Sequence, residues 1–165
     1  MSEVDDGKLI HGPWGNNQRR VEREIVIPAG TNNCQVSWTS FNFGSRDGHE
    51  WDQVAIDGDE VWAKRGNHCN ANDGWTTLVP SFNWGSPHDR RGCYVDVRVV
   101  VPCEGTMEVR FTSSIDEGIN NEAWAFGNLL VVPADGIEPE SDDQFNERVN
   151  EIRRSNRGLV NGQHA

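Results

Sequence analysis

The sequence lacks the features that mark membrane proteins and nucleic-acid-binding proteins. No run approaches the roughly 18 apolar residues of a transmembrane helix, so we expect no membrane insertion. Positive charge is scarce, because 15 lysine and arginine residues stand against 26 aspartate and glutamate residues and the formal net charge is −11. A nucleic acid or an anionic membrane surface needs a basic face on its partner, so we expect neither as the main partner.

A signal for export is also missing. Residues 1–7 are polar and acidic and contain no apolar stretch like that of a secretory signal peptide. A mature secreted chain with an added methionine would look the same. An extracellular location and a cytoplasmic or organellar one therefore both stay open on this evidence.

The motifs of common catalytic sites are absent as well. The chain has no serine within GxSxG, and its five histidines are scattered, with no HxH and no HExxH. Asp52 and Glu122 could formally act as a carboxylate pair in glycoside hydrolysis. A chain of 165 residues with short loops has little material for a deep cleft, so we expect a protein that is not an enzyme.

The cysteines do not have the spacing of a zinc site, because none of them forms a CxxC and no histidine lies at zinc-finger spacing. Two disulfides are the natural alternative, and four cysteines can pair in three ways. We prefer Cys69–Cys93 across a long loop and Cys34–Cys103 between strands. Four buried free thiols in a reducing compartment are the competing interpretation.

Turn-forming and aromatic residues are abundant, whereas residues that favour helices are few. The chain has 17 glycines, 7 tryptophans and 6 phenylalanines but only 2 methionines. This composition, with alternating apolar residues, is typical of short strands joined by ordered loops. We therefore expect an all-β fold, an antiparallel jelly-roll β-sandwich, followed by a short C-terminal α-helix. The expected strands cover residues 21–27, 35–43, 51–56, 60–62, 75–79, 94–101, 107–111 and 124–132.

Within 35–43 the alternation changes phase between Trp38 and Phe41, which predicts a bulge or a bend in that strand.

The composition divides the chain into three parts. Residues 1–19 are polar and glycine-rich and are expected to form a partly ordered arm, and residues 20–133 form the sandwich. Residues 134–165 contain an acidic linker, a helix of about 14 residues over 142–155 and a flexible tail. Three residues share one face of this helix, which must lie on this sandwich or on another subunit, because so short a helix is marginal alone. They are Phe145, Val149 and Ile152.

Acidic residues gather in two of the predicted loops. Asp47, Glu50 and Asp52 follow one strand, whereas Asp116 and Glu122 precede the last strand among asparagines. Oxygen ligands of this kind are those that Ca²⁺ prefers, because it accepts six to eight oxygens in a flexible geometry. The alternative is that these carboxylates cap turns or are simply solvated.

Four segments of the chain form a recognisable series of motifs. They are Ser45-Arg46-Asp47-Gly48-His49-Glu50, then Val54-Ala55-Ile56-Asp57-Gly58 with Val61-Trp62, then Arg110-Phe111-Thr112-Ser113-Ser114-Ile115-Asp116, and Asn121-Glu122-Ala123-Trp124-Ala125-Phe126-Gly127-Asn128. In this order they resemble a jelly-roll, lectin-like module of extracellular proteins from protists and marine bacteria. The pattern of that family is S-W-D-G-E, then x-I-D-G-x-x-V-W, then L-D-x and D-E-S-W-G-I-D-N, and the resemblance covers roughly residues 21–132.

The chain departs from this pattern where cation ligands would lie. Arg46 replaces a tryptophan and Gly127 replaces an aspartate, while Asn121 and Ala123 stand where aspartate and serine are usual. Four matching positions remain, namely Asp47, Glu50, Glu122 and Asn128. Combined with the loop carboxylates, the expected ligands of a bound Ca²⁺ are Asp47, Glu50, Asp52, Asp116, Glu122 and Asn128.

The tryptophans suggest a surface that binds sugars, because an exposed indole packs against the apolar face of a sugar ring. Trp38, Trp62 and Trp124 lie in strand patterns and are expected in the core, whereas Trp75 and Trp84 lie in a loop-rich stretch. A buried tryptophan that anchors a loop is an equally good interpretation of those two. The expected ligand-binding residues are Trp75, Trp84, Asn72, Asp73, Asp89 and Arg90.

Two functional hypotheses follow. The first is a non-catalytic, lectin-like module that binds a glycan or glycoprotein outside the cell or at its surface, with a structural Ca²⁺. The second is a structural subunit of a larger homo- or hetero-assembly, which docks through its N-terminal arm and C-terminal helix.

Overall fold

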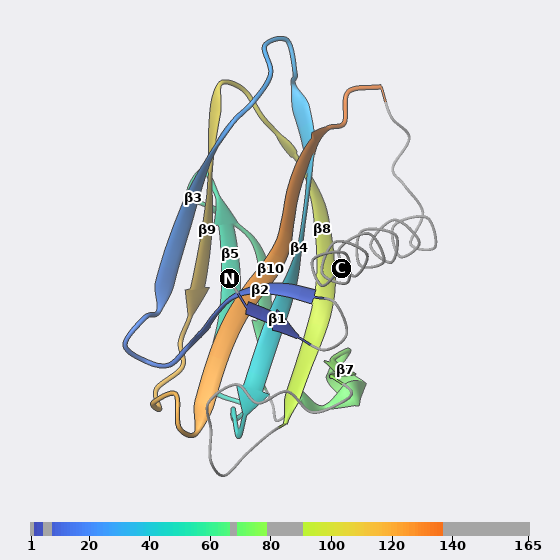
Figure 1. The fold of residues 1–165 in the computed structure, drawn as a ribbon. Coiled ribbons are helices and arrows are strands. Elements are labelled where there is room, and N and C mark those ends of the chain that lie inside the picture. Colours follow the sequence, from blue (N-terminus) through green and yellow to red (C-terminus); the bar gives the residue numbers. More distant parts are fainter. Residues whose placement is uncertain (1, 5–7, 67–68, 79–90, 137–165) are drawn as a thin grey trace, which may run out of the picture.

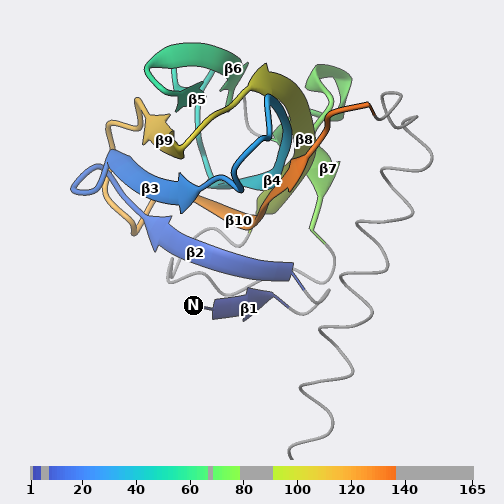
Figure 2. The same ribbon diagram turned by 90° about the horizontal axis from the view of Figure 1, so that it is seen from above.

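The chain folds as two antiparallel β-sheets that face each other, as the computed structural model shows for residues 2–4, 8–66, 69–78 and 91–136 (Figures 1 and 2). The six-stranded sheet has the order β1-β2-β10-β4-β8-β7 and the four-stranded sheet has the order β3-β9-β5-β6. The strands are β1 (Ser2–Val4), β2 (Lys8–Trp14), β3 (Arg20–Val26), β4 (Asn33–Gly44), β5 (Trp51–Ile56), β6 (Asp59–Arg65), β7 (Thr76–Thr77), β8 (Gly92–Pro102), β9 (Thr106–Ser113) and β10 (Glu122–Pro133).

The prediction of an all-β sandwich is therefore confirmed. Within the described ranges the one helix is a short 3-10 turn, η2 (Ala71–Asp73), and no helix there is long and apolar enough to cross a membrane. Alternation explains the strands, because Asp52, Val54 and Ile56 of β5 are buried while Gln53 between them is exposed.

The main core lies between the two sheets and is built from inward-facing residues of both. Aromatic rings dominate its centre, where the rings of Phe111 and Phe126 stack with their centroids 3.9 Å apart. Its buried members are Ile27, Cys34, Val36, Trp38, Val54, Ile56, Val97, Cys103, Met107, Val109, Phe111, Ile115, Trp124 and Phe126.

The bulge predicted between Trp38 and Phe41 does not exist, because β4 pairs with β8 without a register shift from Asn33 to Phe43. Trp38 belongs to the core between the sheets, whereas Phe41 and Phe43 belong to a second buried cluster. Neighbouring residues in a strand point to opposite faces, so the change of phase marks a strand that is buried on both faces.

The irregularity that sequence reasoning placed in β4 lies in its neighbour β10. The pairing of β10 with β4 shifts between Gly127 and Leu130. Asn128, inside this shift, has a φ of 52°, in the left-handed region that asparagine tolerates better than most residues.

Residues 8–14 are not an arm, because they form β2 and pair with β10 of the six-stranded sheet. Ile10 is fully buried, and the ring of Trp14 lies 5.0 Å from that of Trp124. The prediction failed because Gly12-Pro13 interrupts the strand pattern. Gly12 is required there, since its φ is +122° and a Cβ would lie 2.8 Å from the Cβ of Ala125.

Both preferred disulfides are present, so the interpretation of free thiols is wrong. Cys34–Cys103 joins β4 to the residue that follows β8, within one sheet. Cys69–Cys93 joins the chain beyond β6, in the four-stranded sheet, to β8 in the six-stranded sheet. The two bridges lie toward opposite ends of β4, because Cys34 begins that strand and Cys93 pairs with Asn42 near its end.

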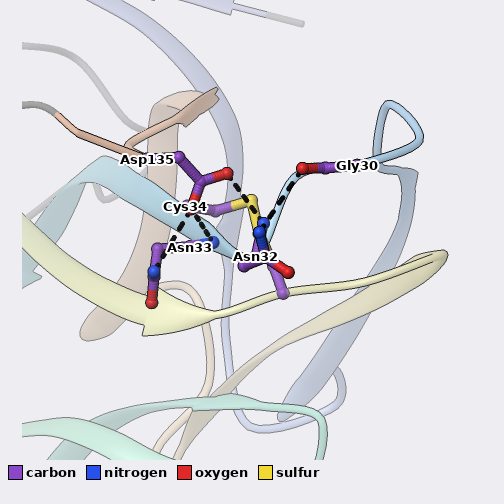
Figure 3. The surroundings of a disulfide bond; sticks show 6 residues. Gly30, Asn32, Asn33, Cys34 and Asp135 are labelled. Carbon is purple, nitrogen blue, oxygen red and sulfur yellow. Dashed lines mark hydrogen bonds between the residues drawn. A yellow bond between two sulfur atoms is a disulfide. The ribbon is translucent and has the colours of Figure 1, made fainter.

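The carboxylate of Asp135 closes the end of the sandwich that holds Cys34–Cys103 (Figure 3). Its oxygens accept hydrogen bonds from the backbone N–H groups of Asn32 and Asn33, at 2.8 and 2.9 Å, and from the Asn33 side chain. These donors hold the pKa of the Asp135 carboxyl below its ordinary value. Ordered structure thus extends past residue 133, the boundary we predicted, whereas the predicted helix residues Phe145, Val149 and Ile152 lie outside the described residues.

The inclusion of β2 in the fold predicts a difference between two Ile→Ala substitutions. Ile10→Ala should lower the free energy of unfolding by about 2–5 kcal/mol, because it opens a cavity in a closed cluster. Ile119→Ala, at a residue that is 40% exposed, should change it little. Urea denaturation of both variants measures this, and equal losses would contradict the placement of β2.

Candidate cation site

The interior of the sandwich is apolar over most of its length but polar at one end. Along the inner face of β4, Val36 and Trp38 give way to Ser40 and Asn42. Inward-facing residues of β5, β9 and β10 and two residues of the loop between β4 and β5 complete this layer. We call the layer the polar end, and its members are Asn42, Arg46, Glu50, Asp52, Ser113 and Glu122, all buried.

Arg46 lies at the centre of the polar end and is only 1% exposed. Its Nη1 donates to the Oδ1 of Asn42 at 2.6 Å and to both carboxylate oxygens of Asp52 at 2.7 and 2.9 Å. Its Nε lies 3.7 Å from Oε2 of Glu50. Gly66 covers the side chain so closely that a Cβ there would lie 2.9 Å from the Cβ of Arg46. The guanidinium thus connects β4, β5 and the loop between them without access to water.

Glu50 fastens the two acidic loops to each other. Its Oε2 accepts from the backbone N–H of Asp47 at 2.9 Å, and its Oε1 accepts from that of Asp116 at 3.0 Å. The Ser45 N–H adds a bond to the Asn121 carbonyl between the same loops. The loop from 45 to 50 and the loop from 114 to 121 therefore meet at one carboxylate.

Three carboxylates converge where these loops meet. Glu50, Asp116 and Glu122 each offer one oxygen, and the three oxygens lie within 4.8 Å of one another. Asp116 is exposed, whereas Glu50 and Glu122 are buried. The Oε2 of Glu122 is buried and has no hydrogen-bond partner, an arrangement that is costly for a carboxylate unless a proton or a cation neutralises it.

The electrostatics of the polar end reflect this excess of negative charge. Burial raises the pKa of Asp52, while Arg46 acts in the opposite direction. Burial also raises the pKa of Glu122, to about 8, and a hydrogen bond and charge repulsion from Glu50 add to the effect. Without a cation, burial and the neighbouring carboxylates therefore favour the protonated form of Glu122 at neutral pH.

Three of the six expected cation ligands do not join this cluster. Asp52 is engaged by Arg46, and Oδ1 of Asp47 accepts from the N–H of His49 at 2.8 Å. Asn128 donates to the hydroxyl of Thr39, at 3.0 Å. Glu50, Asp116 and Glu122 are the expected ligands that the fold brings together.

Two supports of the cluster were missed from the sequence. In the sequence Arg46 stands out only as a departure from a family pattern, although its closeness to Asp52 along the chain could have indicated an ion pair between them. The chain after β2 also holds the loop of Asp116, because the side chain of Asn16 donates to the Asp116 carbonyl at 2.7 Å. A Cβ on Gly15 would lie 2.4 Å from the Ile119 nitrogen. No sequence signal links residues about 100 positions apart in this way.

The expected sugar-binding residues that the structure describes do not form one surface. Trp75 is 3% exposed and its Nε1 donates to the Arg65 carbonyl at 2.9 Å, so it anchors a loop and presents no ring to a ligand. Asn72 and Asp73 are exposed on η2. Trp84, Asp89 and Arg90 lie outside the described residues.

Comparison with protein-family models, with curated proteins and with solved structures finds no match for this chain.

Removal of the Arg46 charge should be strongly destabilising. Arg46→Met keeps an extended side chain but leaves Asp52 buried without its partner, so the free energy of unfolding should fall by about 3–5 kcal/mol. Arg46→Met combined with Asp52→Asn should recover part of this loss. Arg110→Met, which removes two ion pairs on the surface, should change the free energy of unfolding little. Chemical denaturation of the wild type and the three variants tests this, and a double variant that is no more stable than Arg46→Met would contradict it.

The cation-free protein should lose stability as the pH rises. The pKa of Glu122 is raised from its ordinary 4.5 to about 8, so between these values the folded state holds a proton that the unfolded state has released. The free energy of unfolding should therefore fall with a slope of up to about 1.4 kcal/mol per pH unit, and the raised pKa of Asp52 acts in the same direction. Denaturation in EGTA across this range measures the slope, which Glu122→Gln should reduce. A flat profile in the wild-type chain would contradict the assignment.

Proposed function

We propose that this protein is a non-catalytic, lectin-like β-sandwich of the jelly-roll type that binds a glycan and is stabilised by Ca²⁺ held by Glu50, Asp116 and Glu122. The observation that carries the proposal is the buried oxygen of Glu122, which has no partner and shares its site with two further carboxylates. The resemblance of the loop motifs to lectin-like modules supports the choice of ligand.

Charge balance favours a cation at this position. The polar end and Asp116 together bring four carboxylates around one arginine. The hydrogen bonds of Arg46 all come from Nη1 and go to Asp52 and Asn42, not to the other three carboxylates. Ca²⁺ binds oxygens at 2.3–2.6 Å, so oxygens around one ion lie within about 5.2 Å of one another, and those of this cluster lie within 4.8 Å. The ligand atoms that the described residues offer here are all carboxylate oxygens, which suit Ca²⁺ better than a transition metal.

A cation here would act on the loops rather than on the core. It would tie Glu50, Asp116 and the start of β10 together, at the point where the loop from 45 to 50 meets the loop from 114 to 121. Binding surfaces in β-sandwiches are commonly made by loops that a rigid scaffold positions. The bound ion would therefore stiffen the end of the sandwich where a ligand can be recognised.

The topology and the disulfides support the remaining parts of the proposal. From β2 to β10, consecutive strands repeatedly change from one sheet to the other, as in a jelly roll. Two disulfides are typical of a protein outside the cytoplasm, so we place the module in the extracellular space or at the cell surface.

The alternative role, a structural subunit of an assembly, was based on a free N-terminal arm and a C-terminal helix, and the first of these is not present. Residues 8–14 belong to the sheet of their own chain, so they are not free to dock on a neighbour. The predicted C-terminal helix lies outside the described residues and remains the basis of that alternative.

Ca²⁺ should raise the thermal midpoint of the wild-type protein. Ligand at a hundredfold excess over Kd adds about 2.7 kcal/mol to the stability of the folded state, and EGTA should remove this gain. Glu122→Gln should abolish most of the shift, whereas Glu60→Gln, on the exposed part of β6, should keep it. Equal midpoints in Ca²⁺ and EGTA for the wild-type chain would reject the cation site and give more weight to the assembly hypothesis.

The ligand is tested separately. A glycan array in Ca²⁺, followed by calorimetry on the bound glycans, should give binding that EGTA weakens. The absence of binding to any glycan in Ca²⁺ would reject the lectin-like function even if the cation site is real.

A further inference from the structure

We infer that Trp51 and Arg65 form the recognition surface for a sugar that carries a carboxylate, as in a uronic or sialic acid. This inference rests on the proposed glycan-binding function and names the class of ligand. Its basis is a tryptophan that packs in neither core and an arginine stacked on it that has no carboxylate partner in the described chain.

Trp51 differs from every other tryptophan that the structure describes. Trp38, Trp75 and Trp124 are buried, and Trp14 and Trp62 pack against the main core. Trp51 is half-buried and belongs to neither core cluster. Since Asp52 points into the sandwich, its neighbour Trp51 points out from the four-stranded sheet. An indole on an outer sheet face contributes little to the fold, and such rings are used to stack on sugars.

Arg65 lies directly across from Trp51 in the pairing of β5 with β6. Its guanidinium carbon lies 4.7 Å from the centroid of the Trp51 ring, which is a cation–π contact. This contact favours positions of the guanidinium near the ring, which lowers the cost of ordering it when a ligand binds.

Arg65 forms no ion pair with the carboxylates of the described residues, although the protein is rich in them. Arg20, Arg46 and Arg110 all form ion pairs. For Arg65, no carboxylate of the described residues lies within ion-pair distance, and its side chain is exposed. An arginine held in place without an acidic partner can bind a carboxylate from outside through two parallel hydrogen bonds.

The surroundings of the pair suit a flat ring. Gln53 and Ala63 lie beside Trp51 and Arg65 on the same outer face, and the hydroxyl-bearing Thr112 pairs with Gln53. These neighbouring side chains are short or polar. The surface also adjoins the cation site, because Trp51 follows Glu50 and its N–H donates to the Ser114 hydroxyl at 2.7 Å.

A carboxylated sugar fits this surface better than an acidic peptide does. An indole and a guanidinium that lie one on the other recognise an apolar ring face and a carboxylate attached to that ring. An extended peptide would instead use the backbone of an edge strand, and β6 is such an edge in this sheet. Ca²⁺ at the neighbouring cluster would reduce the repulsion between an anionic ligand and a chain of net charge −11.

The experiment compares matched ligands and matched variants in Ca²⁺. The folded wild-type chain is applied to an array of uronic- and sialic-acid glycans, their carboxyl-reduced neutral forms and an acidic control peptide, hexaglutamate. The best glycan is then titrated by calorimetry into the wild-type chain and into Arg65→Met, Arg65→Lys, Trp51→Ala and Arg110→Met. The thermal shift caused by Ca²⁺ is recorded for each variant.

Acidic glycans should bind and their reduced forms should not. Arg65→Met and Trp51→Ala should each weaken binding by about tenfold or more, and Arg65→Lys should weaken it too, because lysine lacks the two-pronged guanidinium. Arg110→Met, on the same outer face, should bind like the wild type. Arg65→Met should keep the Ca²⁺ shift, which separates a lost ligand contact from a lost fold.

Three results would overturn the inference. They are binding of neutral glycans only, binding of the peptide in place of glycans, and acidic-glycan binding that Arg65→Met leaves unchanged. In each of these the Ca²⁺ shift still reports on the cation site. If no glycan binds at all, the glycan-binding function fails first and this inference fails with it.

Discussion

The buried ion pair between Arg46 and Asp52 is the interaction on which one end of this sandwich depends. The apolar core stops before Asn42, and beyond that point the two sheets are joined by a guanidinium that contacts β4 and β5 at once. Such a pair gives little net stability when complete, because both charges lose their hydration, but loss of one partner is severe. The pair therefore enforces a single arrangement of the loops above it more than it adds to the strength of the fold.

The same pair creates the conditions for the cation site. Arg46 neutralises one carboxylate, and its other nitrogens, Nε and Nη2, have no hydrogen-bond partner. Both oxygens of Glu50 accept hydrogen bonds from backbone N–H groups of the two loops. The neighbouring Glu122 keeps one oxygen without a hydrogen-bond partner. The fold thus leaves an excess of negative charge at a place where one oxygen ligand, Asp116, is open to solvent.

The strands could be predicted wherever one face of the sheet is buried and the other is exposed, as in β5 and β9. The prediction was wrong where both faces are buried or where the alternation is interrupted. β4 is buried on both faces, so the change of phase at its Phe41 and Phe43 does not mark a bulge, and the pattern of β2 is interrupted by Gly12-Pro13.

Of the expected cation ligands, Glu50, Asp116 and Glu122 come together because the two acidic loops meet in the fold. Asp52 and Asn128 do not join them. Sequence spacing alone does not reveal that Arg46 and Thr39 engage those two side chains. For Trp75 the second interpretation is the correct one, because this tryptophan is buried and anchors a loop.

The position of β10 between β2 and β4 has a consequence for how this chain acquires its structure. Ile10 pairs with Gly127, and Phe126 pairs with both His11 and Ser40. The six-stranded sheet is therefore complete only after nearly all of the described sequence has been synthesised. Until then β2 and β4 each lack β10 as a neighbour and expose an unpaired strand edge. Folds dominated by such distant pairings form slowly and expose aggregation-prone surfaces on the way. Cys103, 69 residues after Cys34, precedes both β9 and β10, so the Cys34–Cys103 bridge can hold β4 beside β8 before the last strand is added.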